Sequence, residues 1–208
     1  MLKFKYWKFN KNRLEAFSDG VFAIIITLLI LEIKVPHLNS TLDNSELKEK
    51  LFDLIPVFLS WLISFLIVGT LWLQHHNILR MAKHIDYGFV WINILFLLST
   101  SFIPFPSELL GTYPKLPIAV ASLGIVIIFS TFFLWSLYYY IVKNYMRDEY
   151  IYKDVRKNLY LAFFGGPIIY GFAVLMAWVN IYISFVIYSI IPLLFILPLD
   201  KPKKMFLD

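Results

Sequence analysis

The sequence predicts an all-α membrane protein that crosses the bilayer several times. Hydrophobic residues make up 60% of its 208 residues, and its mean hydropathy is +0.71. Long apolar segments alternate with short polar ones, and the basic residues gather in every second polar segment. Soluble domains do not contain such a high share of hydrophobic residues, so we expect the chain to be embedded in lipid as one domain.

Six apolar segments of suitable length predict six membrane spans within a single domain, residues 1–208. We place these spans at residues 14–35, 54–77, 86–103, 117–142, 158–178 and 181–198. About 20 helical residues cross a hydrocarbon core of about 30 Å. The third span should end at Pro104 and Pro106, because proline cannot continue a helix. Residues 37–53 are polar and predict an exposed loop that could contain one helical turn.

The charge distribution predicts the orientation of the chain. Fifteen of the nineteen Lys and Arg residues fall in the N-terminal tail, the segments after the second and fourth spans, and the C-terminus. By the positive-inside rule both termini are then cytoplasmic. The net charge of +5 serves this orientation and gives no reason to expect a nucleic-acid partner. The chain has no cysteine, which excludes disulfides, thiol catalysis and cysteine-based metal sites.

The first span begins with polar residues and continues as a helix that is apolar from Val21 to Leu31 except for Thr27. Arg13, Ser18 and Asp19 precede the apolar run that starts at Val21. A carboxylate facing lipid costs several kcal/mol, so Asp19 should face protein or water. We therefore expect the first span to be an inner helix of the assembly.

A stripe of large aliphatic side chains runs along this helix. At about 100° per residue, Ile24, Leu28 and Leu31 fall within about 60° of one another, and Asp19 lies about 140° from Ile24. The stripe could line a central axis, or it could be ordinary packing or lipid contact. Thr27 lies beside it, and its hydroxyl could face the same axis or bond the carbonyl four residues earlier in its own helix.

The second span ends in an unusually polar group that includes Trp72, His75 and His76. We hypothesise that Asp19 accepts a hydrogen bond from Trp72 or from one of the two imidazoles, with Arg13 nearby. Adjacent helical positions diverge by about 100°, so only one histidine should face Asp19. A metal site is the alternative, but no cysteine and only one nearby carboxylate support it. No set of residues indicates catalysis, so we expect neither an enzyme nor a cofactor.

Two motifs resemble those of a known family. Arg13, Phe17, Ser18 and Asp19 have the spacing R-x-x-x-F-S-D at the start of the first span. Trp72, His75 and His76 form W-x-x-H-H at the end of the second. The chain thus resembles prokaryotic members of the transmembrane protein 175 family, the lysosomal potassium channel family.

This resemblance implies a channel that prefers potassium and lacks the usual TVGYG filter. It implies a homotetramer of six-span subunits in the plasma membrane of a prokaryote, with K+ and the lipid bilayer as its partners. Its first span would line the pore, with constricting rings of Ile24, Leu28 and Leu31 and a hydroxyl layer at Thr27.

Two points stay open at this stage. A secondary transporter of a small cation or solute is the alternative function, and it would need a broken helix or an ionisable site near the middle of the membrane. The candidate for a broken helix is Gly165-Gly166-Pro167, and no charge accompanies it. Glu32 at the outer end of the first span could ring the mouth of a pore, or it could be solvated or paired with Lys34.

Overall fold

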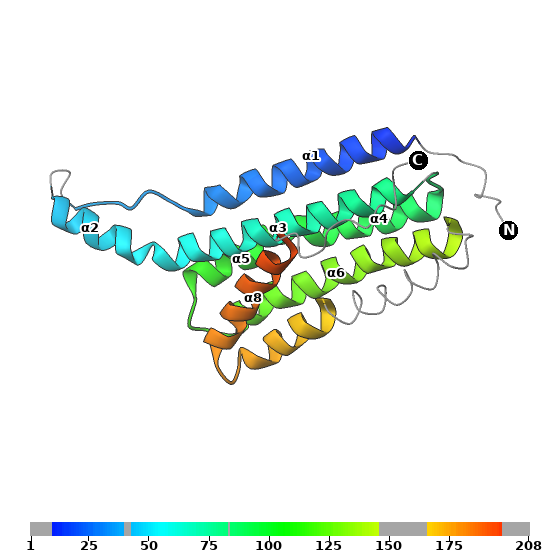
Figure 1. Cartoon of the computed structure of the whole chain (residues 1–208). Coiled ribbons are helices and arrows are strands. Elements are labelled where there is room, and N and C mark those ends of the chain that lie inside the picture. Colours follow the sequence, from blue (N-terminus) through cyan, green and yellow to red (C-terminus); the bar gives the residue numbers. More distant parts are fainter. Residues whose placement is uncertain (1–9, 40–42, 83, 146–165, 197–208) are drawn as a thin grey trace.

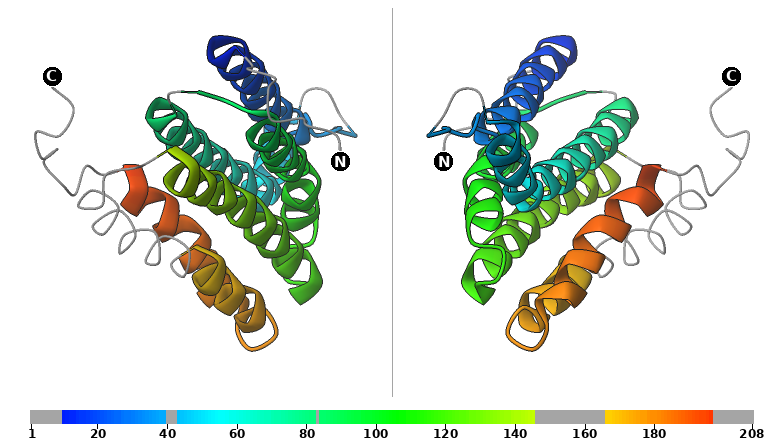
Figure 2. Two further views of the ribbon diagram at one scale, coloured as in Figure 1. Left: turned by 90° about the vertical axis from the view of Figure 1, so that its right-hand side faces the viewer. Right: turned by 90° about the vertical axis from the view of Figure 1, so that its left-hand side faces the viewer.

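The computed structural model describes residues 10–39, 43–82, 84–145 and 166–196, without the side chains of Tyr145, Phe195 and Ile196. Its secondary-structure elements are all helices, which lie roughly side by side in an elongated bundle (Figure 1). Seen end-on, helix α1 (Lys11–Leu29) lies at one extreme of the bundle, and the last two described helices lie at the other (Figure 2). Within the described part of the chain, helix α1 therefore has one side free of other helices.

Helix α1 has one buried side and one exposed side. Its N-cap is Asn10, whose side chain accepts a hydrogen bond from the backbone N–H of Asn12 at 3.0 Å. The short 3-10 helix η2 (Ile30–Glu32) follows directly. Residues at intervals of three and four form the buried stripe: Leu14, Ser18, Phe22, Ile25 and Leu29. This stripe packs against α3 (Ile55–Met81) and α4 (Tyr87–Ser101).

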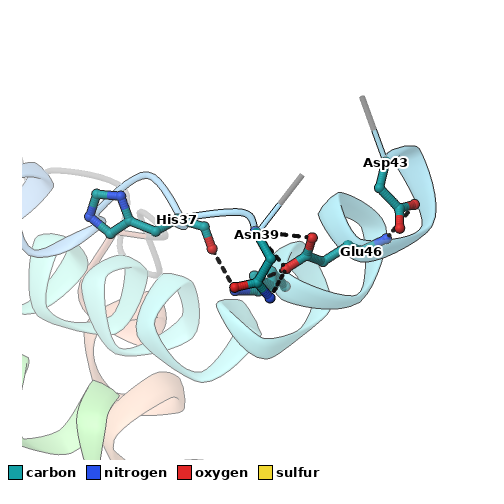
Figure 3. Close-up of polar contacts among 5 residues, drawn as sticks. His37, Asn39, Asp43 and Glu46 are labelled. Carbon is teal, nitrogen blue, oxygen red and sulfur yellow. Dashed lines mark hydrogen bonds and ion pairs between the residues drawn. The ribbon is translucent and has the colours of Figure 1, made fainter. Parts of the chain in front are cut away.

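The segment expected to be a loop contains a helix, so that prediction was wrong. Helix α2 (Asn44–Asp53) begins at the N-cap Asp43, whose carboxylate accepts from the N–H groups of Ser45 and Glu46. The chain leading to it is tied alongside by Glu46, which accepts from Asn39 N–H at 3.1 Å and Asn39 Nδ2 at 2.9 Å (Figure 3). We call residues 33–39 and 43–53 the arm. It extends beyond the end of the bundle (Figure 1).

The helix of the third expected span ends before its prolines, close to the expected position, but the apolar helical segment continues beyond them. Helix α4 ends at Ser101, and after two residues helix α5 (Pro104–Thr112) begins with Pro104 at its first position. Proline fits the first turn of a helix, because the N–H groups there have no partner within the helix. Together, α4 and α5 form an apolar helical segment from Tyr87 to Thr112.

Helix α6 (Pro117–Tyr145) packs along α4 and α5. Tyr140 joins it to the start of α4, because its hydroxyl donates to the Asp86 carboxylate at 2.7 and 2.8 Å. Asp86 is also the N-cap of α4 and accepts from Phe89 N–H. One carboxylate thus fixes the start of α4 and its position against α6.

The last described helices are residues 166–176 and α8 (Ile181–Ile196). Tyr188 of α8 donates a hydrogen bond to Val120 O at 3.1 Å, and Gly124 leaves room for its ring, since a Cβ at that position would clash with the Tyr188 hydroxyl. The first part of the expected fifth span, residues 158–165, lies outside the described residues, as do residues 197–198 of the sixth.

Four helical segments in the described residues are long and apolar enough to cross a membrane: Lys11–Glu32, Ile55–Met81, Tyr87–Thr112 and Pro117–Asn144. They correspond to the first four expected spans. The second extends four residues beyond its expected end at Asn77, and the fourth ends close to the expected position. Two further apolar helices, Gly166–Met176 and Ile181–Leu194, are shorter.

Candidate functional site

The exposed side of α1 carries the aliphatic stripe. Ile24 is 59% exposed, and Leu28, Leu31 and Phe17 are also exposed. The next residue, Ile25, is only 2% exposed. No other helix of the described chain covers this side, so a single copy presents one open apolar wall.

The buried side of α1 is held by a chain of polar side chains from three helices. Asn93 of α4 donates through Nδ2 to Ser18 Oγ of α1 at 3.1 Å. Its Oδ1 lies 2.7 Å from Nε2 of His75 on α3. Since a carbonyl oxygen has no proton, His75 must carry one on Nε2 and donate it. All three residues are at most 1% exposed.

Aromatic rings enclose this polar chain. The His75 ring stacks on Phe96 with centroids 5.2 Å apart, and Phe22 lies 5.8 Å from each of those two rings. In such an apolar setting a lost hydrogen bond is not replaced by water, so each of the three polar residues depends on the other two. Ser18 is thereby fixed, and with it the rotation of α1.

A second polar contact joins α1 to α3 nearer the surface. Trp72 donates from Nε1 to Asp19 Oδ1 at 2.8 Å. His76 stacks on the Trp72 ring at a centroid distance of 5.7 Å. Of the donors that the sequence offered to Asp19, the structure therefore uses the indole. His75 reaches Ser18 through Asn93, and His76 stacks on the indole ring.

Arg13 and Thr27 lie on the exposed side of α1. Arg13 forms no ion pair with Asp19 or any other residue of the described chain. The Thr27 hydroxyl bonds its own helix, donating toward Ala23 O and Ile24 O, each at 2.9 Å. Its proton is thus committed to the backbone of α1, and the Thr27 side chain remains exposed on the open side.

Glu32 has neither of the surroundings that the alternative interpretation gave it. Both carboxylate oxygens are shielded from solvent and form no hydrogen bond that meets normal geometry within the described part of the chain. Lys34 pairs instead with Glu108 of α5, at 3.6 Å. Glu32 is therefore neither solvated nor paired with Lys34 in a single copy, and that interpretation was wrong.

The described residues contain no group of three or more His, Asp or Glu side chains arranged to hold a metal ion. His75 and His76 point to different partners, Asn93 and Trp72. The chemistry on this side of the bundle is therefore that of hydrogen bonding between helices, next to an apolar wall.

Comparison with known proteins places this arrangement in a family. The family model for the endosomal/lysosomal potassium channel TMEM175 matches residues 13–104. The crystal structure of a TMEM175 homologue from Chamaesiphon minutus superimposes with a TM-score of 0.76 at 30% identity, covering 89% of this chain and 96% of that one. The chain belongs to the TMEM175 family. The potassium channel MtTMEM175, at 18% identity and a TM-score of 0.61, shares the fold.

Curated TMEM175 relatives match over shorter lengths. A potassium channel of Chamaesiphon minutus is 40% identical over 133 residues, 60% of this chain and 64% of that protein. A potassium channel of a Chryseobacterium species is 37% identical, over 56% of this chain and 58% of that protein. The bovine endosomal/lysosomal proton channel TMEM175 is 34% identical, over 52% of this chain and 24% of that protein. The chain thus spans less than two thirds of the curated relatives it matches.

The TMEM175 match contains every residue of the polar network, including one that the motifs did not reveal. Asn93 was missed, although it is a lone amide in the apolar helix YGFVWINILFLLSTS. A buried amide almost always has hydrogen-bond partners, so its position inside a span was a usable signal. With family membership, the four apolar helical segments make the chain an integral membrane protein.

Proposed function

We propose that the protein is a potassium-preferring ion channel whose conduction path is lined by the exposed side of α1 from four identical copies. The observation that carries this proposal is the contrast between Ile24 and Ile25, because a stripe of exposed aliphatic side chains stands beside a fully packed one. Membership of the TMEM175 family and relatives named potassium channels support the choice of ion. Each subunit would have six spans, lie in a prokaryotic plasma membrane and keep both termini in the cytoplasm.

The physical basis of conduction is a narrow apolar neck. Rings of Ile24, Leu28 and Leu31 would leave an axial path in which an ion loses part of its water. Potassium holds its water less tightly than sodium, so such a neck favours potassium without a cage of carbonyl groups. Discrimination is then modest. The Thr27 oxygen, whose proton is bonded within α1, remains available to accept or to coordinate a cation.

The Ser18-Asn93-His75 chain and the Asp19–Trp72 bond would hold this wall in place. They bond α1 to α3 and α4 of its own subunit, on the side away from Ile24. A stable neck needs side chains that do not rotate away from the axis, and these bonds fix the rotation of α1.

Flux from liposomes tests the proposal. Liposomes loaded with potassium or sodium and carrying the purified protein should lose potassium faster. Ile24→Asn should wet the neck, raise the flux and reduce the preference, and Leu28→Ala should raise the flux by widening it. Ile118→Ala, on the exposed side of α6, is the matched control and should behave as the parent.

Two results would count against a channel. No potassium flux in the parent protein, or unchanged flux and preference in both Ile24→Asn and Leu28→Ala, would mean that the stripe serves packing. Flux that saturates with potassium concentration would favour the secondary transporter. Because some relatives are named proton channels, proton flux is recorded in the same vesicles.

A further inference from the structure

The two flanks of α1 have different shapes. On one flank α1 meets α4, and an apolar hollow of about 250 Å³ lies between them, lined by Phe17, Val21, Ile94, Leu97, Leu98 and Ser101. The Ser101 hydroxyl donates to Leu98 O at 2.8 Å, so the hollow has no polar group in need of a partner. Its occupant must be apolar. Leu98 stands at its rim and is 65% exposed.

On the other flank α1 meets α3, which offers an open surface. A Cβ added at Gly69 would have nothing within 4 Å, and the same holds for Gly20 of α1. The exposed side chains of Phe65 and Trp72 lie on the same side of α3 as Gly69, at helical spacing. This flank has space where the α4 flank has a protruding leucine.

Gly69 and Leu98 lie at nearly the same depth in the bundle. The hydrogen bond between His75 and Asn93 gives α3 and α4 a common level. The two helices run in opposite directions (Figure 1). Gly69 is six residues from His75, and Leu98 is five residues from Asn93, in the same direction along the bundle. At 1.5 Å per residue these are rises of about 9 and 7.5 Å.

Symmetry then decides which surfaces meet. This step rests on the proposed function, since it requires copies arranged in a ring around an axis lined by α1. Rotation about such an axis keeps every residue at its own depth, and the α3 flank of one copy faces the α4 flank of the next. Such a contact is heterologous, because the two surfaces come from different parts of the chain.

We propose that the ring closes by a heterologous contact in which Leu98 of one copy packs on the open surface at Gly69 of the next. The occupant of the hollow between α1 and α4 is then the neighbouring copy, because the hollow continues the exposed wall of α1 and lies at the depth of the Gly69 surface. The exposed side of α1 in a single copy forms only part of the wall of the conduction path. This contact joins it to the exposed side of α1 in the next copy.

Cysteine cross-linking tests the contact directly, because the natural chain has no cysteine. The double variant Gly69→Cys with Leu98→Cys, treated with a short bis-maleimide in the membrane, should give bands of two, three and four linked subunits. Each single variant should stay unlinked, because a heterologous contact does not bring a residue against its own copy. Differently tagged single variants, expressed together, should link to each other only.

The matched control pairs Gly69→Cys with Phe132→Cys. Phe132 is an exposed residue of α6 that lines neither side of the hollow. This pair should remain unlinked under the same treatment. Cross-linking of the control to the same extent would overturn the proposal, because the reaction would then reflect random encounters between subunits in the membrane and not a specific contact.

The proposed function is measured separately, by the mass of the unmodified protein from light scattering and by its potassium flux. A conducting tetramer in which the Gly69 and Leu98 pair stays unlinked overturns the contact and leaves the channel intact. So does a Leu98→Cys tetramer whose thiol reacts fully with a lipid-soluble maleimide, since lipid would then occupy the hollow. A monomer without flux overturns the channel and the contact together.

Discussion

At the scale of single residues, Asn93 makes three helices depend on one amide. Asn93→Leu keeps the volume of the side chain but leaves Ser18 and His75 without partners in an apolar setting. Unpaired buried polar groups cost about 1–3 kcal/mol each, so we expect a clear loss of stability. Unfolding of the purified protein in mild detergent measures it. Asn144→Leu, at an exposed position on α6, is the control, and an unchanged transition in Asn93→Leu would contradict the expectation.

Asp19 is expected to act through its bond with Trp72. Asp19→Asn removes the negative charge from this acceptor, and hydrogen bonds to charged groups are the stronger ones. We expect a lower yield of assembled tetramer by size-exclusion chromatography. Trp72→Phe removes the donor but keeps a ring beside His76, and it should lower the yield in the same direction. Unchanged assembly and flux in Asp19→Asn would show that the bond is dispensable.

The sequence predicted the hydrogen-bond partner of a buried or interfacial residue better when few candidate partners were available. A carboxylate such as Asp19 at the edge of a span is unfavourable unless it has a partner. The polar end of the second span offered only a few hydrogen-bond donors, and Trp72 was one of them. Asn93 was not found, because one amide in an apolar helix can face lipid, its own backbone or another helix. Choosing between these needs the position of the neighbouring helix, which the sequence does not state.

At the scale of elements, α1 separates two roles between adjacent residues of the same type. Ile25→Ala should lower the stability of the fold by about 2–5 kcal/mol, because Ile25 is fully packed, and should leave the ion preference unchanged. Ile24→Ala should leave unfolding nearly unchanged and should alter flux. Unfolding and liposome flux, measured on both variants, check the separation. Equal loss of stability in the two would mean that Ile24 is covered by packing.

The arm should respond to acid at its helix start. The Ser45 hydroxyl, followed by the N–H groups of Glu46 and Ser45, holds the pKa of Asp43 below its ordinary value. The cap therefore stabilises α2 fully above the ordinary pKa of an aspartate and loses this effect as the pH falls through the lowered one. Hydrogen exchange of the first turn of α2 should rise over that range. The Asp43→Asn variant keeps a capping side chain that does not titrate, so exchange that still changes with pH in this way would contradict the assignment.

Helices were predicted well where a run of apolar residues was long. Their ends, and the helices outside such runs, were predicted poorly. The first and fourth spans follow from uninterrupted apolar runs. Helix α2 was missed although Asp43 and Glu46 have the spacing of a helix N-terminus, because most of its residues are polar. Helix α5 was missed because proline was treated as a stop, whereas at Pro104 it starts a helix.

At the scale of the whole molecule, the distribution of basic residues predicts a direction that no helix contact can give. Helix packing inside the bundle is the same whichever end faces the cytoplasm. The prediction comes from the sequence alone, in which the segments expected on one side hold fifteen Lys and Arg residues and those expected on the other hold four, and basic loops are retained in the cytoplasm. The arm should then face outward, and the connection between α3 and α4 should face inward.

Labelling of single cysteines in intact cells checks this direction, and the cysteine-free chain needs no prior substitution. Glu49→Cys on α2 and His84→Cys between α3 and α4 are both exposed positions. A maleimide that cannot cross membranes should label Glu49→Cys in intact cells and His84→Cys only after permeabilisation. The reverse labelling pattern would show that the protein has the opposite orientation in the membrane, with its basic segments outside the cell. Glu32 and the Lys34–Glu108 pair would then lie at the cytoplasmic end of the path, where they could not attract cations from outside.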